Sequence, residues 1–378
     1  MIDRAEFPYD RPPLSKDYLA GRRDLEQIAL QPPEWYAEQR VDLFGPAEVA
    51  SISPGDDDVA IALTDGRDHR ADWAVLATGG RAAVPLVPGL REARQAGLVH
   101  VLREAEDADR LREVLVPAAA LLVVGGGLIG AEAASTAVGL GAEVVVADPL
   151  DPPLVAAAGR EVAGWLHALH AQAGIETVTS ALEAVQVDGG GVLAQLRGEP
   201  QVRRFDAILV GVGMVPSTEL ASACGLEVDR GVLVDAQQRT SHPRVLAVGD
   251  AARLREHHRT EHWEAAQHDG QRAAATILDA PPPAETAAWW WSDRHQHHVE
   301  GVGTMREPDA QTTIVHRGTR GTEPFSAYTI RAGRLIGAVA IDDPHAIRAA
   351  RRLIDRQIEV DPDRIADPAT DLRKLLRG

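Results

Sequence analysis

The stretch LLVVGGGLIGAEAASTAVGLGAEVVVAD, residues 121–148, decides the fold of this chain. An apolar run is followed by three glycines, a segment typical of a helix, and a second apolar run that ends in an acid. Gly125, Gly127 and Gly130 have the spacing G-x-G-x-x-G, in which the first glycine permits a tight turn, the second a close approach to the backbone, and the third close packing of helix on strand. The stretch predicts a strand–turn–helix–strand unit that binds a dinucleotide pyrophosphate at a helix N-terminus.

The acid at the end of the second run is Asp148, 18 residues after Gly130. A carboxylate there accepts hydrogen bonds from both ribose hydroxyls and repels a 2′-phosphate. The next arginine in the chain is Arg160. The pattern therefore predicts NADH rather than NADPH, against the alternative of a glycine-rich loop that is only structural.

The bulk composition excludes several classes of protein. The chain has 378 residues and a net charge of −17, which excludes general nucleic-acid binding because that needs a basic surface. The longest apolar run is broken by glycines and an acid, so no membrane span is predicted. The single cysteine, Cys224, excludes an internal disulfide and favours a reducing compartment, so we predict a cytoplasmic protein.

Other segments surround this unit. Residues 41–76 and 183–213 alternate apolar runs with turn signals, and each predicts a β-meander that ends in a buried strand. The meander, apolar strand and glycine turn recur at ADWAVLATGG and FDAILVGVGM, which suggests two related nucleotide-binding modules. Helices are predicted at 104–116, 161–172 and 264–278, strands at GVLVD and VLAVGD, and a linker at DAPPPAE, before an α+β domain.

Several motifs together resemble one family, the FAD- and NADH-dependent ferredoxin reductases of oxygenase systems (the putidaredoxin reductase and biphenyl dioxygenase reductase type). They run in family order along the whole chain: PYDRPPLSKDYLAG, LATGGRAAVP, GGGLIGAE, GVGMVPSTEL, GLEVDRGVLVD, RTSHPRVLAVGDAA, HWEAAQHDG and WWWSD. The resemblance implies an α/β fold like that of glutathione reductase, with two dinucleotide domains and a C-terminal α+β interface domain.

The resemblance and the linker give the expected domains. Residues 1–103 and 228–282 are predicted to form the two parts of the FAD-binding domain. Residues 104–227 are predicted to form the Rossmann-like NADH-binding domain, and residues 283–378 the interface domain.

The resemblance also implies residues at the flavin. Asp250 of the AVGD motif corresponds to the acid that binds the ribityl chain of FAD, and its alternative is a helix N-cap. Arg11 and Lys16 of RPPLSK are expected at the flavin, with the lysine near its reactive edge, where a cation stabilises charge on the reduced ring. The alternative is that Ser15 or Asp17 caps a helix and Lys16 is solvated.

Two more residues are expected beside the cofactors. Glu132 corresponds to an acid near the nicotinamide that pairs with the lysine, and its alternative is an acid in the first helical turn that complements the helix dipole. Trp263 is expected against the flavin, with a purely structural role as the alternative. The strand-to-loop crossovers at Thr78-Gly79-Gly80 and Gly211–Gly213 are predicted near the cofactors, and our predicted binding residues there are Thr78, Gly79 and Gly213.

Three histidines raise the question of a metal. His295, His297 and His298 lie where a strand is expected after WWWSD, so alternation would separate them on two faces. No carboxylate or cysteine completes a ligand set in the sequence pattern. We predict no metal site.

The opening residues differ from the family pattern. Members begin with a βαβ unit carrying a G-x-G-x-x-G motif for the ADP half of FAD, and this sequence contains one such motif, the NADH one. About 35 residues, roughly one βαβ unit, are therefore expected to be absent in front. Because the first strand of a doubly wound sheet is central, such a chain is expected to bind FAD poorly or aggregate.

The predicted activity follows from these parts. NADH passes a hydride to flavin N5, and single electrons then go to a small [2Fe–2S] ferredoxin; the single cysteine excludes a relay through a cysteine pair. The alternatives are an NADH oxidase or quinone-type reductase, and a non-catalytic NADH-binding scaffold. Docking of an acidic ferredoxin would need a basic patch, with Arg317, Arg320, Arg331 and Arg334 as candidates. The protein is expected to be a monomer or homodimer.

Overall fold

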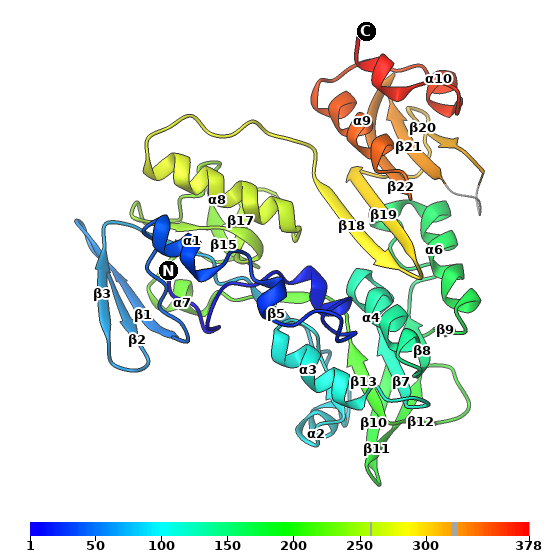
Figure 1. The fold of residues 1–378 in the computed structure, drawn as a ribbon, viewed down its shortest axis with the longest axis horizontal. Coiled ribbons are helices and arrows are strands. Elements are labelled where there is room, and N and C mark those ends of the chain that lie inside the picture. The colour runs from blue at the N-terminus through cyan, green and yellow to red at the C-terminus, as the bar shows by residue number, and fades with distance from the viewer. Residues whose placement is uncertain (258, 320–323, 378) are drawn as a thin grey trace. The chain divides into compact units, whose positions relative to one another are not determined.

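The structure is a computed structural model that describes residues 1–257, 259–319 and 324–377 (Figure 1). The chain folds into two compact units. The first contains Met1–Arg11, Arg23–Arg81 and Met214–Ala284, and the second contains Pro12–Arg22, Ala82–Gly213 and Glu285–Gly378. The four predicted functional domains have other boundaries, and they stay a prediction.

A five-stranded parallel sheet with the order β6-β13-β7-β8-β9 forms the dinucleotide part of the second unit. Its central strand β7 is almost wholly buried, as a parallel strand covered on both faces must be. Helix α4 packs on β7 and β8 (Figure 1). The elements are β6 (Val99–His100), β7 (Ala120–Val124), α4 (Leu128–Gly139), β8 (Glu143–Asp148), β9 (Glu176–Thr179) and β13 (Ala207–Val210).

The predicted second meander is an antiparallel sheet of order β10-β11-β12, which leads into β13 as expected. Its apolar face packs with the parallel sheet in one core. The predicted helix at 104–116 is α3, and Leu111 on it and Leu115 at its C-cap are both buried, as the spacing indicated. These elements are α2 (Leu90–Gln95), α3 (Ala105–Val114), α5 (Val155–Ala158), α6 (Arg160–Gln172), β10 (Leu182–Asp188), β11 (Gly191–Leu196) and β12 (Arg203–Phe205).

The C-terminal part of the second unit is an antiparallel sheet with the order β18-β19-β22-β21-β20. One face packs against α9, whose buried side is Ala346, Ile347, Ala349, Ala350 and Leu353. Apolar residues of its other face pack against α5 and α6. The elements are β18 (Trp289–Arg294), β19 (His297–Gly303), β20 (Thr312–Arg317), β21 (Phe325–Arg331), β22 (Arg334–Ile341), α9 (Pro344–Asp355), α10 (Pro362–Ala366) and η4 (Leu372–Arg377).

The first unit contains the predicted first meander, an antiparallel sheet of order β1-β2-β3, and two parallel strand pairs, β4 with β16 and β15 with β17. The elements are η2 (Glu26–Ile28), α1 (Pro33–Glu38), β1 (Val49–Pro54), β2 (Val59–Leu63), β3 (Asp68–Ala71), β4 (Ala74–Leu76), β5 (Gly80–Ala82, ending one residue into the second unit), β14 (Met214–Pro216), α7 (Glu219–Ala223), β15 (Val232–Val234), β16 (Val245–Ala247), η3 (Gly249–Ala251), β17 (Ala252–Leu254) and α8 (Trp263–Ile277). No helix among the described residues is long and apolar enough to cross a bilayer.

The strand expected after WWWSD is β19, which begins at His297. The sequence analysis missed that the motif itself lies in another strand, β18, and that the chain turns between the two strands at His295 and Gln296, which have φ values of 51° and 67°. The polar residues His-Gln accept this left-handed backbone and so close a hairpin between β18 and β19. The three histidines are therefore divided between a turn and a strand.

Candidate functional site

The glycine loop between β7 and α4 has the conformation that its motif predicted. Gly125 has φ +104°, and a Cβ there would lie 2.4 Å from the carbonyl oxygen of Gly211. A Cβ on Gly130 would lie 2.0 Å from the carbonyl oxygen of Gly125, so α4 packs directly on the turn. A Cβ on Gly127 would have no other heavy atom within 4 Å. The loop thus leaves open space at the glycine where the motif needs a phosphate to approach.

Asp148 lies beside this loop. It is the last residue of β8, and its carboxylate accepts hydrogen bonds of 2.8 Å from the backbone N–H groups of Gly126 and Leu150. Parallel pairing of β7 with β8 brings the carboxyl ends of both strands to one edge, where open α/β sheets bind ligands. The residues present fit a dinucleotide with its pyrophosphate at α4 and a ribose near Asp148.

Lys16 and Glu132 are in contact, as the family resemblance implied. The Lys16 Nζ lies 3.3 Å from Glu132 Oε1, and both side chains are largely buried. The structure contradicts the alternative for Glu132, because this residue is the fifth of α4 and the first turn contains no acid. It also contradicts a solvated Lys16, because that side chain is only 16% exposed, and the preceding Ser15 donates to Glu132 Oε2 at 2.5 Å.

The sequence analysis missed the C-terminal side chains that complete this cluster. Ser292 Oγ and the backbone N–H of Asp293 donate to Glu132 Oε1 at 2.8 and 3.1 Å. The Asp293 carboxylate lies 3.0 Å from Lys16 Nζ. Arg294 is fully buried and donates to Ser292 at 2.9 Å, and burial lowers its pKa to about 10. The available signal was a run of polar residues, SDR, inside an apolar strand pattern.

Three of the predicted FAD residues, Thr78, Gly79 and Asp250, lie in loops that follow two neighbouring strands of the first unit. β16 pairs in parallel with β4, with Ala247 opposite Leu76, so the loops that follow these strands are neighbours. One loop contains Thr78 and Gly79, and the other contains Asp250, in the middle of η3. The N-cap alternative for Asp250 is wrong, since the η3 cap is Val248 and the predicted helix is a short 3₁₀ turn. An acid and glycines at the carboxyl edge of parallel strands fit a nucleotide cofactor.

The remaining predicted residues have local contacts within their own units. The Trp263 Nε1–H donates to Asp10 Oδ1 at 2.7 Å, and the indole is 39 % exposed. The Arg11 guanidinium lies 5.7 Å from the ring centre of Tyr9. The Thr78 hydroxyl donates to the Ser217 carbonyl at 2.6 Å. Gly213, with φ +111°, accepts at its carbonyl a hydrogen bond from the Ala83 N–H.

Two other features bear on the chemistry that the chain can support. Among the described residues no group of three or more His, Cys, Asp or Glu side chains is arranged to hold a metal. Cys224 follows α7, is partly buried, and donates to the Ala221 carbonyl; burial raises the pKa of its thiol. This agrees with the prediction that it is an ordinary packed residue.

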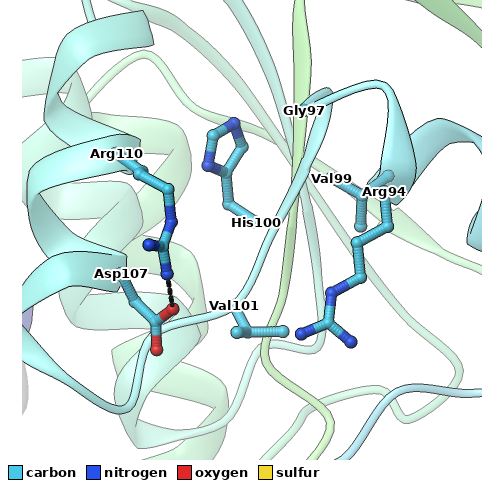
Figure 2. A pocket seen from close by; sticks show the side chains of 7 residues that line it. All are labelled: Arg94, Gly97, Val99, His100, Val101, Asp107 and Arg110. Carbon is cyan, nitrogen blue, oxygen red and sulfur yellow. Dashed lines mark hydrogen bonds and ion pairs between the residues drawn. The ribbon is translucent and has the colours of Figure 1, made fainter.

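A small cleft of about 240 Å³ lies beside the edge strand β6 (Figure 2). Arg94 of α2 and Arg110 of α3 flank it, and Arg110 pairs with Asp107 at 2.5 Å. Burial, with a smaller effect from Arg110, lowers the pKa of His100 in its lining. None of the predicted site residues lines this cleft, and we assign it no part in dinucleotide binding.

The predicted basic patch is smaller than the sequence suggested. The Arg317 guanidinium donates to the carbonyls of Ile365, Asp367, Pro368 and Thr370, so it holds the segment after α10 in place. Arg331 and Arg334 are at the surface, near Gln311 and Glu359. Arg320 lies outside the described residues.

Comparison with known proteins agrees with this geometry. The pyridine nucleotide-disulphide oxidoreductase family model matches residues 1–270, and the reductase C-terminal model matches residues 289–376. Putidaredoxin reductase CamA of Pseudomonas putida is 31% identical over 382 residues, covering 99% of this chain and 89% of that protein. The ferredoxin–NAD(+) reductase component of the anthranilate 1,2-dioxygenase system of Burkholderia cepacia is 34% identical over 384 residues, covering 98% and 91%.

A solved structure extends the similarity to the whole fold. The covalent putidaredoxin reductase–putidaredoxin complex contains a chain with a TM-score of 0.88 and 29% identity, covering 99% of this chain and 90% of that one. The family resemblance and the fold class predicted from the sequence are thereby confirmed, with a C-terminal antiparallel sheet as the third part. The chain belongs to the pyridine nucleotide-disulphide oxidoreductase family and is a flavin- and NAD-dependent oxidoreductase with the two-dinucleotide-domain fold of the ferredoxin reductases.

Proposed function

We propose that this protein is an NADH:ferredoxin reductase that delivers electrons to a small [2Fe–2S] ferredoxin of an oxygenase or hydroxylase system. The observation that carries the proposal is similarity over nearly the full chain to reductases named for such systems, together with an open glycine loop joined to an acid. One similar solved structure is a covalent complex of putidaredoxin reductase with putidaredoxin.

The second unit supplies the proposed NADH site. In this proposal the N-terminus of α4 and the backbone around Gly127 bind the pyrophosphate. Asp148 accepts hydrogen bonds from the ribose hydroxyls and disfavours a 2′-phosphate. Arg160, the first arginine after Asp148, lies 3.8 Å from the Glu307 carboxylate, which reduces its value as a phosphate ligand. These residues support a preference for NADH.

The proposed FAD residues are Asp250, Thr78, Gly79, Arg11, Gly213 and Trp263, with Lys16 toward the reactive part of the flavin. When bound, FAD supplies the exchange between a two-electron donor and one-electron acceptors. Asp250 would bind hydroxyls of the ribityl chain, and Lys16 would place a positive charge beside the ring, held by Glu132. The division into domains with residues 1–103 and 228–282 around FAD, 104–227 around NADH and 283–378 as interface is part of this proposal.

The acceptor is inferred from what the side chains can do. With one cysteine, Cys224, the chain has no cysteine pair to exchange with a disulfide substrate. Arg331 and Arg334 of the C-terminal domain are proposed to contact an acidic ferredoxin. If ferredoxin binding does not weaken at raised salt, electrostatic docking through these arginines is wrong. We further propose a cytoplasmic monomer or homodimer.

The deciding experiment measures electron transfer from NADH by the purified chain after addition of FAD. In the fraction of the chain that retains FAD, bleaching of the flavin bands by NADH is expected, followed by anaerobic reduction of a [2Fe–2S] ferredoxin. Rapid NADH turnover with oxygen or a quinone alone, and none that depends on ferredoxin, would instead indicate an oxidase or quinone-type reductase. A colourless chain that still binds NADH would indicate a non-catalytic scaffold.

A further inference from the structure

We propose that Asp293 and His298 of the C-terminal domain are positioning residues, which hold the ammonium group of Lys16 in place. The inference rests on the proposed function for the role of Lys16 at the flavin. The contacts themselves lie within one compact unit. It connects the C-terminal sheet to a side chain assigned to the flavin.

Asp293 is the nearer of two carboxylates beside Lys16. The Lys16 Nζ lies 3.0 Å from Asp293 Oδ2 and 3.3 Å from Glu132 Oε1, and the lysine side chain is only 16% exposed. It also lies 5.6 Å from the ring centre of Trp291. An ammonium group that is largely removed from water and has two carboxylates within 4 Å is confined to a small volume.

Glu132 alone would hold the lysine less firmly. Its two oxygens already accept hydrogen bonds from Ser15, Ser292 and the backbone of Asp293. These donors hold the Glu132 carboxylate in place and occupy most of the lone pairs with which it can accept hydrogen bonds. Asp293 therefore supplies the closer contact, and its orientation decides where the Lys16 ammonium lies.

His298 fixes that orientation. Its Nδ1 lies 2.5 Å from Asp293 Oδ1, which leaves Oδ2 for Lys16. Its Nε2 lies 3.9 Å from the Glu300 carboxylate. The hydrogen bond that His298 donates to Asp293 raises the pKa of His298 to about 10, so the imidazole is a cation at neutral pH. Burial acts to raise the pKa of Asp293, but His298 and Lys16 together lower it.

The charges of the cluster are balanced across the elements that meet there. The cations are Lys16 after η1 (Pro12–Ser15), Arg294 of β18 and His298 of β19, and the carboxylates are Glu132 of α4, Asp293 of β18 and Glu300 of β19. Asp342, after β22, accepts the backbone N–H of His298. Loss of the His298 charge leaves three carboxylates with two cations, so Asp293 is expected to turn and draw Lys16 away from Glu132.

The chain contains a matched control for this contact. The adjacent residue His297 forms a similar imidazole–carboxylate pair, with Nδ1 2.8 Å from Asp342 Oδ2. Its ring instead packs on Trp165, with ring centres 5.3 Å apart. Substitution of His297 thus removes a histidine and its contact with a carboxylate from the same strand while leaving Asp293 in contact with Lys16.

The experiment uses the fact that the chain has two lysines, Lys16 and Lys374. Selective ¹⁵N-lysine labelling gives two ammonium signals by NMR, with the exposed Lys374 as the internal reference. Slow proton exchange is expected for Lys16 in the unaltered chain. His298→Gln and Asp293→Asn should each speed exchange at Lys16 about tenfold, the factor for losing one charge-assisted hydrogen bond, and His297→Gln should not.

A second readout tests the consequence for the proposed reaction. With FAD added, His298→Gln should change the pH profile of NADH-dependent flavin reduction, and His297→Gln should leave it unchanged. Unaltered exchange at Lys16 in His298→Gln would overturn the positioning role; His298 is 41% exposed, so this variant is expected to fold. A chain that shows the exchange effect but never oxidises NADH would refute the proposed function and keep the positioning role.

Discussion

Asp148 accepts a 2.8 Å hydrogen bond from the backbone N–H of Gly126, which ties the acid at the end of β8 to the glycine loop after β7. Two strands that are adjacent in a parallel sheet thus bring together the parts that we propose to bind phosphate and ribose. The acid is pre-oriented, so a ligand need not order it on binding.

Asp148→Asn should raise the KM for NADH at least about tenfold and narrow the preference for NADH over NADPH, because a charge-assisted hydrogen bond is worth roughly 1.5–3 kcal/mol. Asp151→Asn, three residues later, is the control and should change neither value. The measurement is steady-state kinetics with both cofactors. Equal losses for NADH and NADPH would show that Asp148 does not contact the ribose.

Gly130→Ala should destabilise the protein by about 3 kcal/mol, since its Cβ would lie 2.0 Å from the backbone oxygen of Gly125. Gly139→Ala in the same helix meets nothing within 4 Å and should stabilise it by about 0.5 kcal/mol. Urea unfolding of both variants measures the difference. Equal stability of the two would contradict the close packing of α4 on the glycine turn.

Lys16→Met should slow NADH-dependent flavin reduction about tenfold or more by removing a fixed positive charge, and leave the KM for NADH nearly unchanged. The other lysine provides the control, because Lys374→Met alters an exposed residue of η4. Stopped-flow absorbance with the FAD-loaded chain separates the two effects. A changed KM with an unchanged rate would place Lys16 in nucleotide binding instead.

The contribution of His298 to the stability of the protein should be lost as the pH rises. Its ordinary pKa of 6.5 is raised to about 10 by its hydrogen bond with Asp293, so the folded chain retains a proton that the unfolded chain releases. The stabilisation is complete below pH 6.5 and is lost as the pH rises through about 10. The free energy of unfolding should fall less over this range in His298→Gln than in the unaltered chain. Parallel curves would refute the contact with Asp293.

His170 should instead make the protein less stable as the pH falls. Burial, followed by the neighbouring His295, Arg294 and His167, lowers its pKa from 6.5 to about 3, and its Nδ1 lies 3.0 Å from His295 Nε2. Below pH 6.5 His170 binds a proton in the unfolded chain but not in the folded chain. The free energy of unfolding therefore falls as the pH falls from 6.5 to about 3. His170→Phe should reduce this acid sensitivity, measured by thermal unfolding between these pH values. The same acid dependence in the variant would show that other groups cause it.

The sequence determined the β7–α4–β8 unit almost completely. Its signals are local: an apolar run for a buried parallel strand, glycines where φ is positive or a Cβ would collide, and an acid 18 residues beyond Gly130. The meanders and α3 were predictable for the same reason, because the period of apolar residues reflects the geometry of each element. The hairpin at His295 was missed because its turn lacks the glycine or proline that usually marks one.

Only the tertiary structure decided the surroundings of Lys16 and Glu132. These residues are 116 positions apart, and Ser292 lies 160 positions beyond Glu132. From the sequence alone, a solvated Lys16 was the favoured interpretation, and Glu132 had the alternative of an acid that complements a helix dipole. Burial removes water from both, and each then needs a partner from another segment. Which segment provides it depends on how β18 packs on α4, and local sequence preferences contain no information about that packing.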